Sequence, residues 1–309
     1  GNARDIEKGK QVHDEVVSRG LLKTDIVLSN ALVDMYVKCG SLAKALEVLN
    51  DSPEYGCSAW NLVLSAFVDQ GNGECALHIY ERMHKYGVSF SPSAFVSALQ
   101  ACGDTSCLEI CRQLHFGIVS TGYEVNLMIA NTLIHAYGSC ASTADSQGIF
   151  DLLPQPDVFV YSACIAGYAL EGDCHSSCCI FESMQLIDIS PNRVTFLSLI
   201  CATNHSGIID MGIMFFKSMM KIYFLTPDVK HYAAMIELLG RAGDFAKVKK
   251  LLEGMPMRGD VAIWSTLLGA CLTHGNLALG KQAFEHATCS DPMDVAAYVL
   301  MSNLYADAN

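Results

Sequence analysis

The chain repeats itself at an interval of 101 residues. The segment that starts at Asn30 recurs at Asn131 (131 − 30 = 101), and the segment that starts at Trp60 recurs at Tyr161 (161 − 60 = 101). A fixed period of this kind indicates stacked supersecondary units, none of which buries its apolar face alone. The repetition therefore predicts one solenoid whose function lies on an extended surface and not in a single pocket.

Each repeat has the pattern of two helices joined by a turn. In the repeat 57–91, Trp60 and Phe67 mark the apolar side of a first helix that Gly71 ends, and Met83 belongs to the apolar side of a second helix. No stretch has the alternating pattern of a strand. The sequence therefore predicts an all-α fold, a right-handed α-solenoid of helix-turn-helix repeats, with Trp60 and Trp264 buried between helices.

The repeat lengths vary in a regular cycle of about 35, 35 and 31 residues, by subtraction of equivalent positions. A repeat array is predicted over residues 1–260. It consists of a partial repeat at 1–25 and full repeats at 26–56, 57–91, 92–126, 127–157, 158–192, 193–228 and 229–260. Residues 261–294 form a further unit of different pattern, and residues 295–309 begin another.

The fourteen cysteines fall inside helix patterns, which favours a role as small apolar fillers in a reducing compartment. The fillers include Cys39, Cys75, Cys102, Cys140, Cys164, Cys201 and Cys271. Two crowded clusters, Cys102 to Cys111 and Cys174 to Cys179, lack the paired Cys-x-x-Cys spacing of a zinc site. We therefore expect no metal, no cofactor and no small-molecule substrate.

The charge balance counts against a simple phosphate-binding surface. Thirty-two acidic residues outnumber twenty Lys and Arg, for a formal net charge of −12. The dense basic run at Lys247, Lys249 and Lys250 is either a solvated helix face or a phosphate contact. The most apolar stretch, 194–220, is interrupted by polar residues before it reaches the length of a membrane span, so no membrane contact is expected.

The repeats resemble those of the pentatricopeptide repeat family of plant organelles, in the subclass that alternates standard, long and short repeats. Residues 58–88 resemble the standard repeat, 29–48 the short one, 9–20 the end of a long one, and 231–256 the final short one. Residues 263–292 resemble the E-type C-terminal extension motif of this subclass, and a second extension motif begins near 297.

The resemblance implies binding of single-stranded organellar RNA with one base per repeat. It further implies a specificity factor for cytidine-to-uridine editing that recruits a deaminase or an editing accessory protein through residues 261–309. The expected location is the mitochondrion or the chloroplast, with the mitochondrion preferred, and a targeting peptide is expected to lie outside this chain.

No catalytic residue is predicted, and the chain is expected not to be an enzyme. A zinc deaminase needs His-x-Glu followed by Pro-Cys-x-x-Cys. His13-Asp14-Glu15 matches only the first half of that motif. Two alternatives to editing remain open, namely a protein-binding helical scaffold like a tetratricopeptide array, and an RNA stabilisation or processing factor.

The family reads each base with the fifth residue of a repeat together with its last residue. By this resemblance, Asn61 with Ser91 favours cytidine, Asn131 with Asp157 favours uridine, and Ser162 with Asn192 favours adenosine. The weaker pairs are Asn30 with Gly56, Val96 with Asn126, Leu197 with Asp228, Ala233 with Asp260, and Ser265 with Asp294. Asn and Ser are also common at helix N-termini for purely structural reasons.

Family members clamp each base between apolar side chains of adjacent repeats. Met128, Phe159 and Val194 stand at the matching places in this sequence. Stacking on such side chains contributes about 1–3 kcal/mol per base in comparable single-strand binders. It would supply affinity that an acidic chain does not obtain from phosphates.

Overall fold

The computed structural model describes residues 3–23, 26–51, 57–255 and 261–307, and all regular structure in these residues is helical. The chain forms two compact halves, Gly1–Gln155 and Pro156–Asn309. The N-terminal half contains α1 (Ala3–Ser18), a 3-10 turn η1 (Leu21–Lys23), α2 (Ile26–Lys38), α3 (Leu42–Asp51), α4 (Cys57–Asp69), α5 (Gly73–Lys85), α6 (Pro92–Thr105), α7 (Leu108–Thr121), α8 (Leu127–Ser139) and α9 (Thr143–Leu152). The C-terminal half contains α10 (Val158–Leu170), α11 (Cys174–Leu186), α12 (Arg193–Ser206), α13 (Ile209–Lys221), α14 (Val229–Arg241), α15 (Phe245–Glu253), α16 (Val261–Thr273), α17 (Leu277–Ser290) and α18 (Val295–Asp307). The all-helical prediction is confirmed.

The first helix of each repeat begins where the sequence pattern places it. The eight predicted starts, Ile26, Cys57, Pro92, Leu127, Val158, Arg193, Val229 and Val261, are each the first residue of a helix. Five of these helices have a described cap whose side chain accepts a backbone N–H of the first turn. Such caps satisfy donors that the helix itself leaves without partners, and they fix the residue at which each helix begins.

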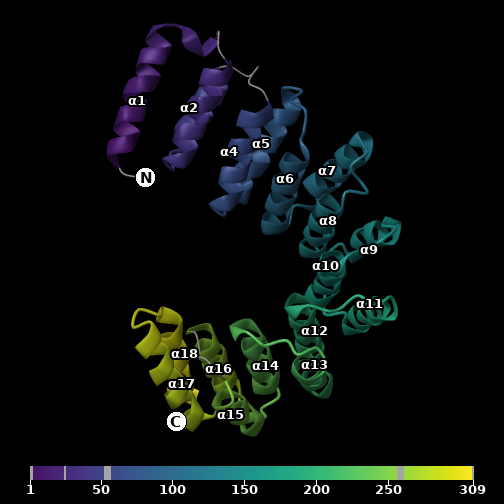
Figure 1. Cartoon of the computed structure of the whole chain (residues 1–309). Helices are drawn as coiled ribbons and strands as arrows, with labels where there is room; N and C mark the ends of the chain where they lie inside the picture. The colour runs from purple at the N-terminus through teal and green to yellow at the C-terminus, as the bar shows by residue number, and fades with distance from the viewer. Residues whose placement is uncertain (1–2, 24–25, 52–56, 256–260, 308–309) are drawn as a thin grey trace. The chain divides into compact units, whose positions relative to one another are not determined.

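Within each half, the first helices of successive repeats lie side by side in one layer (Figure 1). In the N-terminal half these are α2, α4, α6 and α8, and in the C-terminal half they are α10, α12, α14 and α16, with α18 next. Each second helix packs on its own first helix, and most also contact the first helix of the following repeat. The N-terminal ends of the first helices therefore form a row of equivalent positions.

Aromatic and aliphatic side chains fill the space between the layers. Trp60 is fully buried, as predicted, and in the C-terminal half one hydrophobic cluster extends from Ile165 to Leu304. Trp264 is only partly buried, so that prediction was wrong. Its ring stacks on His286 with centroids 4.3 Å apart. Helical periodicity places a residue on the apolar side, but it does not say how far the neighbouring helix covers it.

Hydrogen bonds between successive repeats recur at equivalent places. His115 Nδ1 lies 3.0 Å from the Tyr137 hydroxyl, and His13 Nδ1 lies 2.9 Å from that of Tyr36. Burial lowers the pKa of the His115 imidazole, because its charged form would lose solvation. Both pairs join a helix to the first helix that follows it in the array, and they fix the angle between the two.

The other ends of the first helices in the C-terminal half are also joined. His205 Nδ1 bonds to the carbonyl oxygen of Ala169 at 2.7 Å, and Arg241 Nη1 donates to that of Asn204 at 3.3 Å. His274 Nε2 donates to the carbonyl oxygen of Arg241 at 3.1 Å. The carbonyl oxygens of Ala169 and Asn204 also accept a backbone N–H of the turn that follows their helix, so these side-chain bonds add a contact between neighbouring first helices.

Substitution by alanine should have opposite effects on stability at Gly240 and at Gly269. A Cβ on Gly240 of α14 would lie 2.7 Å from the Cβ of Ala270, whereas nothing lies within 4 Å of a Cβ on Gly269 of α16. We expect Gly240→Ala to force α14 and α16 apart and to lower the free energy of unfolding by about 1–3 kcal/mol. Gly269→Ala should raise it by about 0.5–1 kcal/mol, because alanine loses less backbone entropy in a helix.

Chemical denaturation followed by circular dichroism would compare both glycine variants with the unchanged chain. A shift of both midpoints in the same direction would contradict this packing between α14 and α16.

None of the described helices combines the length and the apolar character that a membrane crossing requires.

Candidate nucleic-acid interface

Five of the predicted last residues are described as helix N-caps. Ser91, Asn126, Asp157, Asn192 and Asp228 each accept a hydrogen bond from the first turn of the next first helix. Capping alone accounts for the presence of Ser, Asn or Asp at these positions. The contact with the fifth residue of the same repeat is therefore the more informative observation.

Asn61 and Ser91 are in direct contact. Asn61 Nδ2 donates to Ser91 Oγ at 2.8 Å, and Ser91 Oγ also accepts the backbone N–H of Ala94 at 3.2 Å. The Asn61 side-chain oxygen has no hydrogen-bond partner among the described residues, and neither has that of Asn30. An unsatisfied buried acceptor is uncommon in proteins. It lies here at the fifth position of two consecutive repeats.

Ser162 and Asn192 are connected through a third residue. Ser162 Oγ lies 2.7 Å from Thr195 Oγ1, and Thr195 Oγ1 lies 3.2 Å from Asn192 Oδ1. Ser162 is only 3% exposed and also donates to the carbonyl oxygen of Val158 at 2.7 Å. The sequence did not indicate that Ser162 is buried. Asn192 is therefore the more accessible member of the pair.

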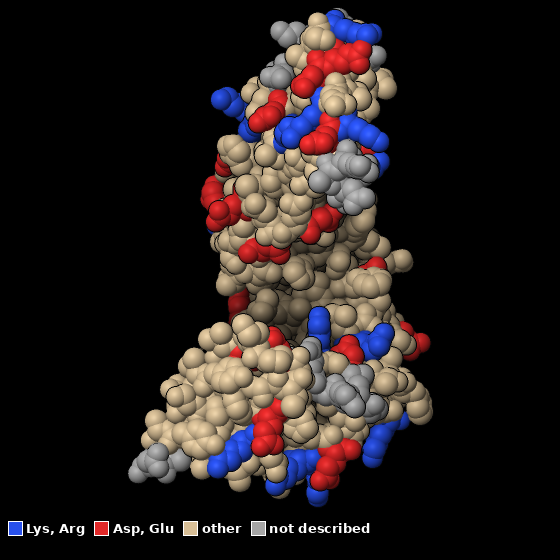
Figure 2. Space-filling view, turned by 90° about the vertical axis from the view of Figure 1, so that its left-hand side faces the viewer, with Lys and Arg blue, Asp and Glu red and all other residues tan. Residues whose placement is uncertain are grey.

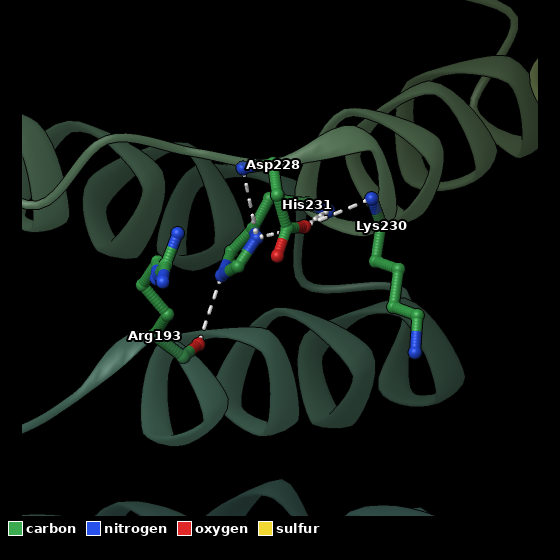
Figure 3. A network of polar contacts seen from close by, with 4 residues as sticks. All are labelled: Arg193, Asp228, Lys230 and His231. Carbon is green, nitrogen blue, oxygen red and sulfur yellow. Dashed lines mark hydrogen bonds and ion pairs between the residues drawn. The ribbon is translucent and has the colours of Figure 1, made fainter. Parts of the chain in front are cut away.

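Asp228 is held in a capping network at the start of α14 (Figure 3). Its Oδ1 accepts the backbone N–H of Lys230 at 3.0 Å and lies 2.7 Å from Nδ1 of the buried His231. His231 Nε2 in turn donates to the carbonyl oxygen of Arg193 at 2.8 Å. Burial raises the pKa of the Asp228 carboxyl, but the hydrogen bonds and charge of its partners outweigh burial and hold this pKa below its usual value.

The remaining predicted pairs differ in what surrounds them. Ser265 Oγ donates to Asp294 Oδ2 at 3.1 Å, which repeats the direct contact seen at Asn61. Asn131 belongs to the N-terminal half and Asp157 to the C-terminal half, where Asp157 caps α10. Val96, Leu197 and Ala233 are partly buried and have no polar side-chain group, while Gly56 and Asp260 lie outside the described residues.

The residues predicted to stack on bases are exposed apolar side chains. Met128 is 59% exposed, Phe159 63% and Val194 56%. Each is the second residue of its first helix, and Val27, at the same place in α2, is 77% exposed. Val27 was not singled out from the sequence, although its position in the repeat would have identified it. At the same place α4, α6 and α14 have the polar residues Ser58, Ser93 and Lys230, so the exposed apolar residue recurs in some repeats and not in all. Exposed apolar residues that recur at a fixed place are typical of a binding surface.

The face of the molecule drawn in Figure 2 carries both positive and negative side chains. On the face drawn in Figure 2, Lys and Arg lie among Asp and Glu, and broad areas carry no charge. Lys247, Lys249 and Lys250 are exposed on α15, a second helix, whereas the fifth residues lie on first helices. Lys247 pairs with Asp244 at 2.8 Å. This placement favours the solvated-face interpretation of the basic run.

Comparison with known proteins agrees with the geometry. A family model described as a pentatricopeptide repeat domain matches residues 144–204, and one described as a PPR repeat matches 27–57, 58–88 and 230–260. The chain belongs to the pentatricopeptide repeat family. A putative mitochondrial pentatricopeptide repeat-containing protein of Arabidopsis thaliana is 31% identical over 97% of this chain and 48% of its own length. A chloroplastic one from the same plant is 32% identical over 98% of this chain and 38% of its own length.

Solved structures show the same fold. The chain matches maize PPR10 in complex with an 18-nt psaJ RNA element with a TM-score of 0.72 at 19% identity, over 100% of this chain and 46% of that one. It matches another crystal structure of maize PPR10 with a TM-score of 0.63 at 17% identity, over 97% of this chain and 49% of that one. This pentatricopeptide repeat chain therefore spans less than half the length of these relatives.

The cysteines of the pentatricopeptide repeat array are free thiols. Burial raises the pKa of the Cys102 thiol to about 12, and it also raises that of Cys111. Cys75, predicted as an apolar filler, is instead exposed. Among the residues that the structure describes, no group of three or more His, Cys, Asp or Glu is arranged to hold a metal ion.

Thr195 and His231 were not singled out from the sequence, although each bonds to a predicted base-reading residue. Both are the third residue of a first helix and both bond to the last residue of the preceding repeat. In the other first helices this third residue is apolar: Leu28, Ala59, Ala94, Ile129, Val160 and Ile263. A polar residue at a place that is otherwise apolar is the signal that would have found them.

Proposed function

We propose that this chain binds single-stranded RNA and reads one base per repeat. The observation that carries the proposal is the contact between the fifth and the last residue of the same unit. It is direct at Asn61 and Ser91 and at Ser265 and Asp294, and it is relayed at Ser162 and Asn192. Paired donors and acceptors of this kind can distinguish base edges.

The likeness to RNA-bound maize PPR10 supports RNA as the ligand. The proposed base preference of the repeats from Cys57 to Asn192 is 5′-C-n-U-A-3′, where n faces the Val96 repeat. Stacking of bases on the exposed second residues of the first helices supplies affinity that an acidic chain does not obtain from phosphates.

Phe159→Ala tests the stacking. Phe159 is 63% exposed, so the substitution should leave the free energy of unfolding within about 0.5 kcal/mol. RNA affinity should fall by about 1–3 kcal/mol, because one base loses its aromatic platform. Leu186→Ala is a matched control, since Leu186 is 86% exposed but lies on the second helix α11. Equal affinities of the two variants in a titration with one RNA would contradict the role of Phe159.

We further propose that the chain is a non-enzymatic specificity factor for cytidine-to-uridine editing in a plant organelle. The support is the resemblance of residues 263–292 to an E-type extension motif, together with mitochondrial and chloroplastic relatives. In this proposal a deaminase or an accessory protein binds through residues 261–309.

Sequencing organellar RNA from plants that lack the protein tests the editing role. Loss of one or a few editing events, each next to a sequence that fits 5′-C-n-U-A-3′, is the expected result. Unchanged editing with shortened or unstable transcripts would favour RNA stabilisation or processing instead.

Protein binding is a second candidate, and the surface that favours it lies away from the fifth residues. Ile213, Phe216 and Met220 of α13 line a groove together with Lys217 and, from α15, Lys250. An apolar groove with basic residues at its edge suits a protein segment better than an RNA strand. This surface is compatible with RNA reading on the first helices.

A further inference from the structure

The residue at the third place of a first helix affects the hydrogen bonds that the last residue of the preceding repeat forms. Where the third residue of the next repeat is Ala94 or Ala297, the fifth and last residues touch each other directly. Where it is Thr195 or His231, the last residue is bonded to this third residue instead. Leu197, the fifth residue of the repeat that ends at Asp228, has no polar group, so it is Thr195 that stands between two polar members of a pair.

The hydrogen bonds of Thr195 fix the orientation of the Asn192 amide. The backbone N–H of Thr195 lies 3.0 Å from Asn192 Oδ1, and a backbone N–H can only donate. The atom of Asn192 that faces Thr195 is therefore the oxygen, and Nδ2 is the group that remains. No described residue accepts a hydrogen bond from Nδ2.

The Thr195 hydroxyl holds both members of the reading pair. It accepts the backbone N–H of Asn192 at 3.1 Å and lies within bonding distance of both Asn192 Oδ1 and Ser162 Oγ. Thr195 Oγ1 donates its one hydroxyl proton to Asn192 Oδ1, so the contact with Ser162 Oγ carries a proton when Ser162 donates to Thr195 and not to Val158. Thr195 is fully buried, so it cannot form these bonds with water instead.

We infer that Thr195 is a positioning residue for base selection by the repeat 158–192. Its backbone N–H orients the Asn192 amide, and its hydroxyl occupies the second lone pair of Asn192 Oδ1, so that the amide N–H groups and not the oxygen face a bound base. The same hydroxyl keeps that of Ser162 in the interior. The repeat then selects a base that offers an acceptor at that place. This inference rests on the proposed RNA-binding function.

Thr195→Val tests the inference, because valine keeps the shape of threonine and removes the hydroxyl. Thr203→Val is the matched control: Thr203 is also fully buried in α12, but its hydroxyl donates to the backbone oxygen of Ile200. Thr195→Ser restores the hydroxyl. Titration would use RNAs that contain 5′-C-n-U-A-3′ and differ only in the base facing repeat 158–192 or only in the base facing repeat 57–91.

The unchanged chain should distinguish bases at both places by about 5- to 150-fold, the range for one mismatched position. Thr195→Val keeps the backbone N–H bond to Asn192 Oδ1 but frees the second lone pair of that oxygen, so it should lower the ratio at repeat 158–192 and leave the ratio at repeat 57–91 unchanged. Thr195→Ser and Thr203→Val should keep both ratios.

Full discrimination by Thr195→Val would overturn the inference while leaving base reading intact. Equal loss at both places would also overturn it, since a general loss of folding would then be the cause. Absence of RNA binding by the unchanged chain would overturn the proposed function and the inference together.

Discussion

Replacing Trp60 by alanine should lower the free energy of unfolding by about 3–5 kcal/mol, the range for loss of a buried large aromatic side chain. Trp60 is fully buried on α4, and the Arg82 guanidinium lies 5.4 Å from the centre of its ring. Its indole nitrogen has no hydrogen-bond partner among the described residues. The cost should therefore come from lost packing and from the cavity that remains.

Phe116→Ala is the control for Trp60→Ala. Phe116 is an aromatic residue of the same half of the chain, but it is 78% exposed on α7. Its replacement should change the free energy of unfolding by less than about 0.5 kcal/mol. Denaturant unfolding followed by circular dichroism compares the two, and similar losses in both variants would contradict the placement of Trp60.

Ser91→Asp should change the base that the repeat 57–91 prefers from cytidine to uridine. The substitution converts the Asn61 and Ser91 pair into the combination found at Asn131 and Asp157. Aspartate caps a helix as well as serine does, so the start of α6 should be kept. Its carboxylate can still accept from Asn61 Nδ2, now in a charge-assisted bond.

The size of the change should resemble that of one mismatched base, about 1–3 kcal/mol in relative affinity, by analogy with protein–DNA recognition. Creating the same combination of Asn and Asp at Ser162 and Asn192 would be a poorer test of base reading. Ser162 is buried and bonded to Thr195, so a larger asparagine there would disturb packing as well as recognition.

The positions of the helices could be predicted from the sequence because local signals agree with the repeat. The residue before Pro92, Leu127, Val158, Arg193 and Val229 is in each case a cap, and its chemistry marks the boundary. The same agreement made the fifth and last residues of a repeat identifiable as one group of positions.

The parts of the site that were missed depend on contacts across repeats. Ser162 and Thr195 are 33 residues apart, and the bond between them follows from how closely α10 and α12 approach. Neither periodicity nor propensity contains that distance. The partial exposure of Trp264 and the exposure of Cys75 have the same cause, since burial depends on the neighbouring helix.

The most direct test of base reading is a binding titration with two RNAs that differ only in C or U opposite the repeat 57–91, at one stated salt concentration. The unchanged chain, Ser91→Asp and Ser89→Asp would be compared. Ser89 is exposed in the same linker, so Ser89→Asp adds the same charge without changing the cap. The unchanged chain and Ser89→Asp should prefer C, and Ser91→Asp should prefer U. Equal affinity of Ser91→Asp for both RNAs, or a preference for C as strong as that of the unchanged chain, would contradict base reading by this repeat.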